Sequence, residues 1–115
     1  MYLIDWNHDT QKIEASLGGH ITLTEAQVFT DDLIERLKPL IDEDFSFQLD
    51  YSKASRLDPG VSDVLQRAQS YCQLHGARKI TFIAKDDYEA ELMIGQRLQQ
   101  VLEGAEEYVV YQAAA

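Results

Sequence analysis

The sequence predicts an α/β fold: a mixed sheet of four to five strands with helices packed mainly on one face, in the order β-β-α-β-α-β-α-β. Three observations carry this prediction. The chain has 115 residues, the size of a single domain, and 45% of them are hydrophobic, which is enough to build a core. Strand-like alternation and helix-like periodicity follow one another along the whole length. Helical segments separate the later strands, and strands joined through a helix pair in parallel. We expect residues 1–115 to form one domain.

An antiparallel hairpin is expected at the start of the chain. Residues 2–6 alternate between faces and are rich in β-formers, and the turn-forming residues 7–10 follow. Residues 12–17 alternate again, which predicts the second strand of the hairpin. The pair Gly18-Gly19 is expected to end this strand or to form a bulge in it.

The first helix is predicted to begin at Thr24, because Thr24 and Gln27 have the spacing of a capping box. Its apolar stripe recurs at helical intervals and consists of Val28, Phe29, Leu33, Ile34, Leu37 and Ile41. Pro39 and the acidic residues 42–44 are expected to close the helix. Residues 45–49 then alternate, which predicts a strand that ends at Asp50.

The second helix has clear boundary residues. Asp58 is the expected N-cap, Pro59 suits the first helical position, and Gly76 suits the position just after the helix. Residues 79–84 predict a central strand, with Ile80 and Phe82 beside the strand of Phe47 and Leu49 and parallel to it.

A third helix and a last strand are expected to complete the chain. Asp86 and Glu89 form a second capping-box pattern, and the helix that they begin is predicted to run to Gly104. Residues 108–111 are a β-rich run and predict the last strand.

The charge of the chain limits the classes of partner. The net charge is −10 and the pI is near 4.5, so the chain repels phosphate groups and we expect no nucleic-acid partner. No apolar run approaches the ~20 residues that a membrane span needs, and residues 1–9 lack the pattern of a signal peptide. We therefore expect no membrane insertion and a cytoplasmic location. The single cysteine, Cys72, is expected to be a buried apolar group.

Motifs for catalysis are missing from the sequence. It contains no phosphate-binding glycine loop, no C-x-x-C and no H-E-x-x-H, and its three histidines are scattered. We therefore expect no cofactor, no metal site and no enzymatic activity. An enzyme would require Asp50, Asp58 and a histidine to converge. His75 suits the last turn of the second helix, where it complements the helix dipole.

The segment of residues 50–60 stands out. A strand is expected to end at Asp50, a polar loop follows, and Asp58 opens a helix, so hydroxyl groups and backbone N–H groups gather near a helix N-terminus. A loop of this kind binds an anion, presents a serine for phosphorylation, or is simply a well-capped connection.

This segment, with the order of elements around it, resembles the STAS domain family, whose members include the bacterial anti-sigma-factor antagonists. The family pattern is a strand ending in Asp-Leu-Ser, a short loop, an apolar residue, and Asp-Ser-Ser-Gly or Asp-Thr-Gly-Gly at the start of a helix. Asp50-Tyr51-Ser52 matches the start of this pattern, Leu57 the apolar position and Asp58 the second aspartate. The similarity covers residues 12–111.

The resemblance implies a regulatory module that binds another protein: an anti-sigma factor, a kinase-like protein or a transporter-associated assembly. Members of the family switch by phosphorylation of the hydroxyl residue just after the second aspartate. That position is Pro59 here, and Val61 stands where the family has a glycine. We therefore expect the usual phosphorylation switch to be absent. A retained switch would require Ser55 or Ser62 to have taken over as the phosphate acceptor.

These observations together predict a non-catalytic protein-binding module. Its expected partner surface consists of Ser52, Ser55, Arg56, Asp58, Gly60 and Ser62. The alternative is a domain that holds a small ligand, a lipid or a nucleotide, between the sheet and the helices. Its support is a supply of aromatic residues that core packing also explains: Trp6, Phe29, Phe45, Phe47, Phe82, Tyr108 and Tyr111.

Overall fold

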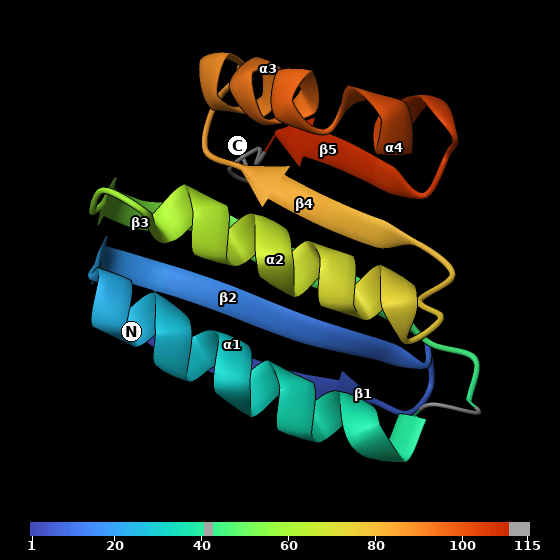
Figure 1. The fold of residues 1–115 in the computed structure, drawn as a ribbon. Helices are drawn as coiled ribbons and strands as arrows, with labels where there is room; N and C mark the ends of the chain where they lie inside the picture. Colours follow the sequence, from blue (N-terminus) through green and yellow to red (C-terminus); the bar gives the residue numbers. More distant parts are fainter. Residues whose placement is uncertain (41–42, 111–115) are drawn as a thin grey trace.

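A computed structural model gives the fold and describes residues 1–40 and 43–110. Five strands form a mixed sheet in the order β1-β2-β3-β4-β5 (Figure 1). The hairpin strand β1 (Tyr2–Asn7) is antiparallel to β2 (Lys12–Ile21). The remaining strands, β3 (Ser46–Leu57), β4 (Ile80–Ala84) and β5 (Glu106–Val110), continue the sheet in parallel with β2. The predicted fold class is confirmed, with five strands.

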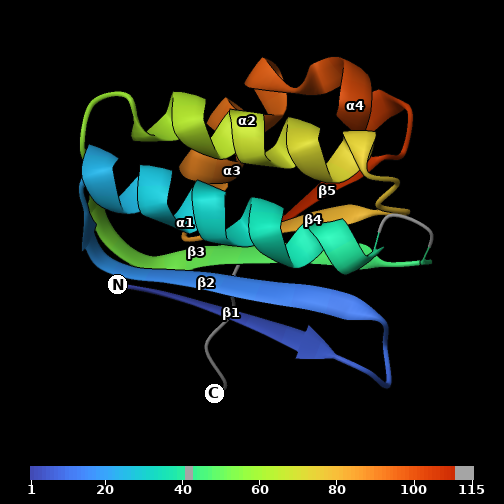
Figure 2. The same cartoon turned by 60° about the horizontal axis from the view of Figure 1, so that its bottom comes forward.

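The helices connect the parallel strands and lie on one face of the sheet (Figure 2). α1 (Leu23–Leu37) and the short 3-10 turn η1 (Lys38–Leu40) follow β2, and α2 (Val61–Leu74) follows β3. α3 (Asp87–Gln96) and α4 (Leu98–Leu102) lie between β4 and β5. None of the described helices combines the length and the apolar character that a membrane crossing needs.

The core fills the space between the sheet and this helical layer. Alternate side chains of each strand point towards the helices, and the largest buried ones include four phenylalanines: Phe29, Phe45, Phe47 and Phe82. The predicted pairing of the central strands is confirmed, since Phe47 lies beside Ile80 and Leu49 beside Phe82 in parallel register. The ring of Phe82 also stacks on Tyr108, with centroids 4.9 Å apart.

Within the described residues no helix covers the opposite face of the sheet (Figure 2), which carries mainly polar side chains together with the exposed Leu3 and Val109. A row of polar side chains crosses this face from β2 to β5: Glu14, Gln48, Thr81 and Glu107. The ammonium of Lys79 lies 3.0 Å from the Glu107 carboxylate, and the Thr81 hydroxyl donates to it at 2.9 Å. These contacts lower the pKa of Glu107 and keep the carboxylate charged.

The start of α1 differs from the prediction. Thr22, not Thr24, is the N-cap, and its hydroxyl accepts a hydrogen bond from the Glu25 N–H at 3.1 Å. Thr22 and Thr24 could each cap a helix that starts here. Thr22 is the cap because it directly follows the end of β2 and has an extended backbone. The buried stripe runs at helical spacing through Ala26, Phe29, Thr30, Leu33 and Leu37. The prediction that Val28 belongs to this stripe is wrong, because its position faces solvent and its side chain is 50% exposed. Ile41 and Asp42 lie outside the described residues.

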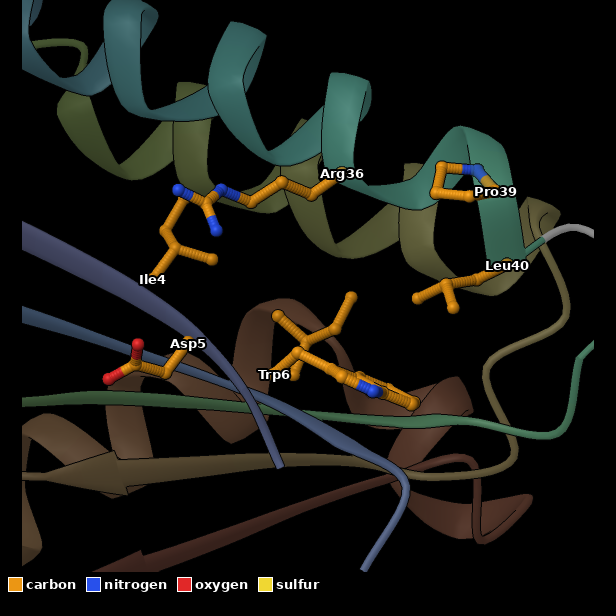
Figure 3. Close-up of a pocket in the computed structure, with 7 residues that line it drawn as sticks. Ile4, Asp5, Trp6, Arg36, Pro39 and Leu40 are labelled. Carbon is orange, nitrogen blue, oxygen red and sulfur yellow. The ribbon is translucent and has the colours of Figure 1, made fainter. Parts of the chain in front are cut away.

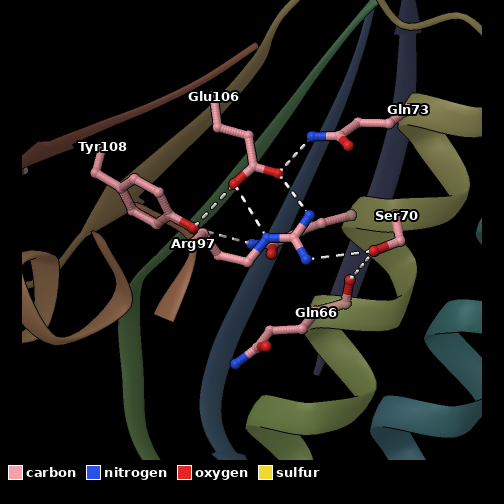
Figure 4. A network of polar contacts seen from close by, with 7 residues as sticks. Gln66, Ser70, Gln73, Arg97, Glu106 and Tyr108 are labelled. Atoms are coloured by element: carbon pink, nitrogen blue, oxygen red, sulfur yellow. Dashed lines mark hydrogen bonds and ion pairs between the residues drawn. The ribbon is translucent and has the colours of Figure 1, made fainter. Parts of the chain in front are cut away.

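The third predicted helix is in fact two helices. Asp86 caps α3 as expected, since its carboxylate accepts from the Glu89 N–H at 2.9 Å. The helix does not run on to Gly104, because the backbone leaves the helical region at Arg97. The Arg97 guanidinium turns inward to Glu106 of β5, with N–O distances of 2.8 and 3.3 Å (Figure 4). The last strand begins at Glu106 rather than at residue 108, and Tyr111 lies outside the described residues.

The end of α2 follows the prediction. Gly76 adopts a φ of +90°, which suits a glycine just beyond a helix. His75 lies at the C-cap, and its Nδ1 donates to the Tyr71 carbonyl at 2.9 Å. Cys72 is buried, and burial raises the pKa of its thiol to about 12, so it behaves as an apolar core residue.

Candidate functional site

The carboxyl ends of the parallel strands lie together at one end of the sheet. β2, β3 and β4 all end there, and α1, α2 and α3 begin from this carboxyl end of the sheet (Figure 1). In open sheets of this kind, binding sites gather at the carboxyl ends of the strands, where loops and helix N-termini are exposed. The residues predicted for partner binding lie at this carboxyl end of the sheet: Ser52, Ser55, Arg56, Asp58, Gly60 and Ser62.

The polar loop that was predicted after Asp50 is in fact a continuation of β3. The strand does not end at Asp50 but runs to Leu57, and its second half pairs with the end of β2. Gly18 lies opposite Lys53, and His20 lies opposite Arg56. The register shifts twice along this pairing, and each time the extra residue lies on β3, so β3 is the bulged strand and the double glycine does not end β2. In Figure 2, both strands curl towards the helical layer here.

Beyond Asp50, β3 has a strand neighbour on one side only. β4 pairs with residues 47–50 of β3 and then ends, while β2 stays paired as far as Leu57. Residues 51–57 therefore present an edge that no described strand covers. An uncovered strand edge offers backbone N–H and C=O groups to an additional strand. The polar sequence of this half-strand follows from its position, because little of the helical layer covers it and Lys53, Ser55 and Arg56 are exposed.

The serines of this strand differ in how they are held. Ser52 is half-buried, and both its backbone N–H and its hydroxyl donate to Oδ1 of Asp50, at 2.9 and 2.6 Å. Ser55 is exposed at the edge. Ser62 lies in the first turn of α2 and is half-buried. The three predicted serines are thus divided between one with a fixed hydroxyl, one on the surface and one beside the core.

The connection from β3 to α2 is a tight turn rather than a capped helix start. The N–H of Val61 donates to the Asp58 carbonyl at 3.1 Å, and Gly60 has φ +89° and ψ −15°. Proline followed by a glycine of positive φ is typical of a type II turn. The prediction that Asp58 caps the helix and that Pro59 is its first residue is therefore wrong. Because the turn occupies both positions, the helix begins at Val61 with Gly60 as N-cap.

The Asp58 side chain instead binds His20, a residue that sequence reasoning left unassigned. Nε2 of His20 donates to Oδ1 of Asp58 at 2.6 Å, and Nε of Arg56 lies 3.6 Å from the same oxygen. The three residues join the end of β2 to the turn before α2. Only the pairing of β2 with β3 brings them together, since His20 and Asp58 are 38 residues apart. A histidine directly after the pair Gly18-Gly19 was the signal available in the sequence.

The contact between His20 and Asp58 brings together two of the three groups that an enzyme would need here. His20 and Asp58 converge, but the Asp50 carboxylate is bound to Ser52 instead. Among the hydrogen bonds of the described residues, His20 contacts no hydroxyl or thiol group that it would activate. Likewise, residues 1–40 and 43–110 contain no group of three or more acidic, histidine or cysteine side chains arranged to hold a metal ion.

A hollow lies beside the hairpin, between β1, the start of β2 and the end of α1. It has a volume of about 270 Å³ and an almost wholly apolar lining that includes Ile4, Trp6, Pro39 and Leu40 (Figure 3). Arg36 reaches over it from α1, and its Nε donates to Asp32 at 3.2 Å. None of the residues predicted for partner binding lies in this hollow.

Comparison with known proteins relates the chain to others through its structure alone. The sequence matches no family model, and no curated protein is similar to it. The anti-sigma factor antagonist SpoIIAA, solved in its unphosphorylated form, superposes with a TM-score of 0.58 at 6% identity, over 99% of this chain and 90% of SpoIIAA.

A second solved structure is an uncharacterized protein of the DUF3478 family from Shewanella loihica, which has a SpoIIAA-like fold. It superposes with a TM-score of 0.63 at 12% identity, over 98% of this chain and 86% of the other. The likeness therefore spans nearly the whole chain in both cases. The expected resemblance is confirmed at the level of the fold: this chain has the SpoIIAA-like fold of STAS domains.

Proposed function

We propose that this chain is a non-catalytic regulatory module that binds another protein through the free edge of β3 and the start of α2. One observation carries the proposal: residues 51–57 extend beyond β4 and leave a strand edge without a described neighbour. Such an edge accepts an extended segment of a second chain, because main-chain hydrogen bonds supply affinity and alternate side chains supply specificity.

The charges at this edge favour an acidic segment. Lys53 and Arg56 are exposed there, on a chain whose net charge is −10. A local positive feature on an acidic surface orients the encounter with a negatively charged partner. Ser55 lies between the two basic residues and adds an exposed hydroxyl group.

The likeness to SpoIIAA supports the class of partner. By that analogy the partner is an anti-sigma factor. The STAS resemblance of the sequence adds a kinase-like or transporter-associated protein as further classes of partner, and we propose that the module acts in the cytoplasm. Pro59 has no hydroxyl group, so this chain binds without the phosphorylation switch at that position. Incubation with the partner kinase, followed by mass spectrometry, is expected to show no phosphate on Ser55 or Ser62.

Site-specific crosslinking tests the location of the surface. A photoreactive benzophenone residue at position 55 is expected to capture the partner in native cell extract. The same residue at Thr10, which is exposed in the hairpin turn at the other edge, is expected not to capture it. Capture of the same protein from both positions would contradict the proposal.

A titration of the captured and purified partner tests the charge. Arg56→Glu is expected to weaken binding at least ten-fold, while Arg78→Glu leaves it unchanged. The control is closely matched: Arg56 is 70% exposed and 3.6 Å from Asp58, and Arg78 is 67% exposed and 3.7 Å from Asp44. Both variants are expected to melt within a few degrees of the wild type, since exposed substitutions shift stability by about 0.5 kcal/mol. Equal affinity of the two variants would place the partner elsewhere.

A further inference from the structure

The strand β1 lies at the outer edge of the sheet, and β2 is its only neighbour among the described strands. Its pairing with β2 is regular over all six residues, from Tyr2 to Asn7, without a bulge. The strand also contains no proline and no lysine. Bulges, prolines and lysines are features that commonly keep a free strand edge from pairing with a further strand, and β1 has none of them.

Alternate residues of β1 present their backbone groups to this free edge. Met1 and Gly18 exchange two backbone hydrogen bonds, at 2.8 and 2.9 Å. Because hydrogen-bonded and non-hydrogen-bonded pairs alternate along an antiparallel ladder, Leu3 and Asp5 also bond to β2. The residues whose N–H and C=O groups point away from β2 are therefore Tyr2, Ile4 and Trp6.

The side chains of these edge residues face the helical layer, where the hollow beside the hairpin lies. Ile4 is only 4% exposed, and together with Trp6 it forms the floor of the hollow. Pro39 and Leu40, at the end of the first helical segment, complete the apolar lining (Figure 3). The Asp5 side chain lies on the other face of the sheet, since side chains alternate along a strand.

A further strand beside β1 would direct side chains into this hollow. Paired strands lie about 4.8 Å apart, and residues directly opposite each other point to the same face. A residue opposite Trp6 therefore points to the side where Pro39 and Leu40 lie. An apolar cavity of about 150 Å³ holds one benzene molecule, so the hollow of about 270 Å³ has room for an aromatic or branched aliphatic side chain.

The charge over the hollow favours a carboxylate close to that apolar side chain. The Arg36 guanidinium lies over the part of the hollow nearer to Ile4 (Figure 3). Its Nε donates to Asp32 at 3.2 Å, but among the described residues neither of its terminal nitrogens makes a hydrogen bond. The residue of an added strand opposite Ile4 faces the same side, two positions from the apolar residue, so a carboxylate there is placed to pair with Arg36.

We infer that the free edge of β1 and the hollow beside it form a second docking site, which binds an extended segment of another protein. The segment carries an aromatic or branched aliphatic residue and, two positions from it, an aspartate or a glutamate. Main-chain hydrogen bonds to β1 supply affinity, and the two inward side chains supply specificity. The site shares no residue with the proposed partner surface, so either proposal can fail without the other.

A second copy of this chain is a poor occupant of the site. Its own β1 has no carboxylate on the inward face, which consists of Tyr2, Ile4 and Trp6. Two chains that each carry a net charge of −10 also repel one another.

The peptide Thr-Glu-Thr-Phe-Thr-Glu-Thr tests the site. It has a carboxylate two positions to either side of its aromatic ring, so it suits a parallel or an antiparallel strand. Trp6 is the only tryptophan of the chain and lines the hollow, so its fluorescence reports binding. The peptide is expected to bind at least ten-fold more tightly than a version with alanine in place of phenylalanine, and at least three-fold more tightly than a version with glutamine in place of both glutamates.

Arg36→Gln is expected to abolish the preference for glutamate over glutamine in the peptide. Lys79→Gln is the matched control, because it also removes one positive charge, and Lys79 is 50% exposed where Arg36 is 49% exposed. Lys79 lies outside the hollow, so this variant is expected to keep the preference. A preference that Arg36→Gln retains would overturn the assignment of the carboxylate to Arg36.

Hydrogen exchange of single amides, followed by NMR, tests the added strand. Bound peptide is expected to slow the exchange of the Ile4 and Trp6 amides, while the Leu3 and Asp5 amides, which already bond to β2, change little. Equal binding of the phenylalanine and alanine peptides, or slowed exchange in residues 51–57 instead of β1, would overturn the inference. Slowing at Ile4 and Trp6 that grows with protein concentration in the absence of peptide would also overturn it, because the occupant would then be a second copy.

Discussion

Glu106 brings a carboxylate into the core beneath α2. Its side chain is fully buried, and it accepts hydrogen bonds from Arg97 and from Gln73, the latter at 2.7 Å (Figure 4). Arg97 in turn donates to the Ser70 hydroxyl at 3.3 Å. A buried ion pair of this kind gives little net stability over apolar packing, but either charge becomes costly when its partner is removed. These contacts tie α2, the break between α3 and α4, and β5 into one arrangement.

The Arg97–Glu106 pair yields a stability prediction. Arg97→Met is expected to lower the free energy of unfolding by about 3 kcal/mol, because Glu106 stays buried without its counter-charge. The double variant with Glu106→Leu is expected to recover more than half of that loss. Urea unfolding monitored by circular dichroism measures both. Arg36→Met breaks a 3.2 Å pair with Asp32 on the surface and is expected to cost no more than about 1 kcal/mol. Equal losses for Arg97→Met and Arg36→Met would contradict this account of the pair.

Glu89 yields a prediction about pH. Burial and the nearby Asp86 raise the pKa of Glu89, so the folded chain holds this proton more tightly than the unfolded chain does. The stability that results is present below the ordinary pKa of 4.5 and is lost as the pH rises through the folded value. Glu89→Gln is therefore expected to match the wild type near pH 4 and to become the more stable protein towards pH 7.

Thermal melts from pH 4 to pH 7 measure this difference. Glu91→Gln, at an exposed position on the same helix, corrects for the loss of one negative charge from an acidic chain. A wild type that remains at least as stable as Glu89→Gln at pH 7 would be inconsistent with the desolvation of Glu89.

At the scale of elements, the helix starts show how local patterns compete. Asp86 followed by Glu89 is an isolated capping pattern, and α3 begins there. Before α1, two threonines lie two residues apart, and the end of β2 decides which of them becomes the cap. Before α2, the turn formed by Pro59 and Gly60 displaces the capping role of Asp58, which is then available to His20. The N-cap of a helix is predictable from local sequence only where the same residues do not also belong to a neighbouring turn or strand.

The two threonines give a direct test at this scale. Thr22→Ala is expected to lower the stability of the chain by about 1 kcal/mol, because the Glu25 N–H loses its acceptor. Thr24→Ala, two residues along and exposed, is expected to change stability by no more than about 0.5 kcal/mol. Chemical denaturation of both variants measures the difference. A larger loss for Thr24→Ala would restore the capping box that the sequence suggested.

At the scale of the whole molecule, the order of elements and the parallel central strands could be predicted from the sequence. Periodicity is a local property, and Phe47, Leu49, Ile80 and Phe82 carry it clearly. The second half of β3 could not be predicted in this way. It pairs with β2 through two bulges, and its polar residues lack the alternation of a half-buried strand.

The candidate site depends on the same long-range pairing. The residues that match the family pattern are visible in the sequence, but their conformation and their contact with His20 follow from the bulged β2–β3 ladder.

Hydrogen exchange with and without the partner captured at position 55 tests the central claim most directly. An added strand is expected to slow the exchange of backbone amides in residues 51–57, because they would gain hydrogen bonds at the uncovered edge of β3. Amides of the hairpin turn at residues 8–11 are expected to exchange at the same rate in both samples. Slowed exchange in the hairpin turn or on β5, with residues 51–57 unchanged, would contradict the proposed surface.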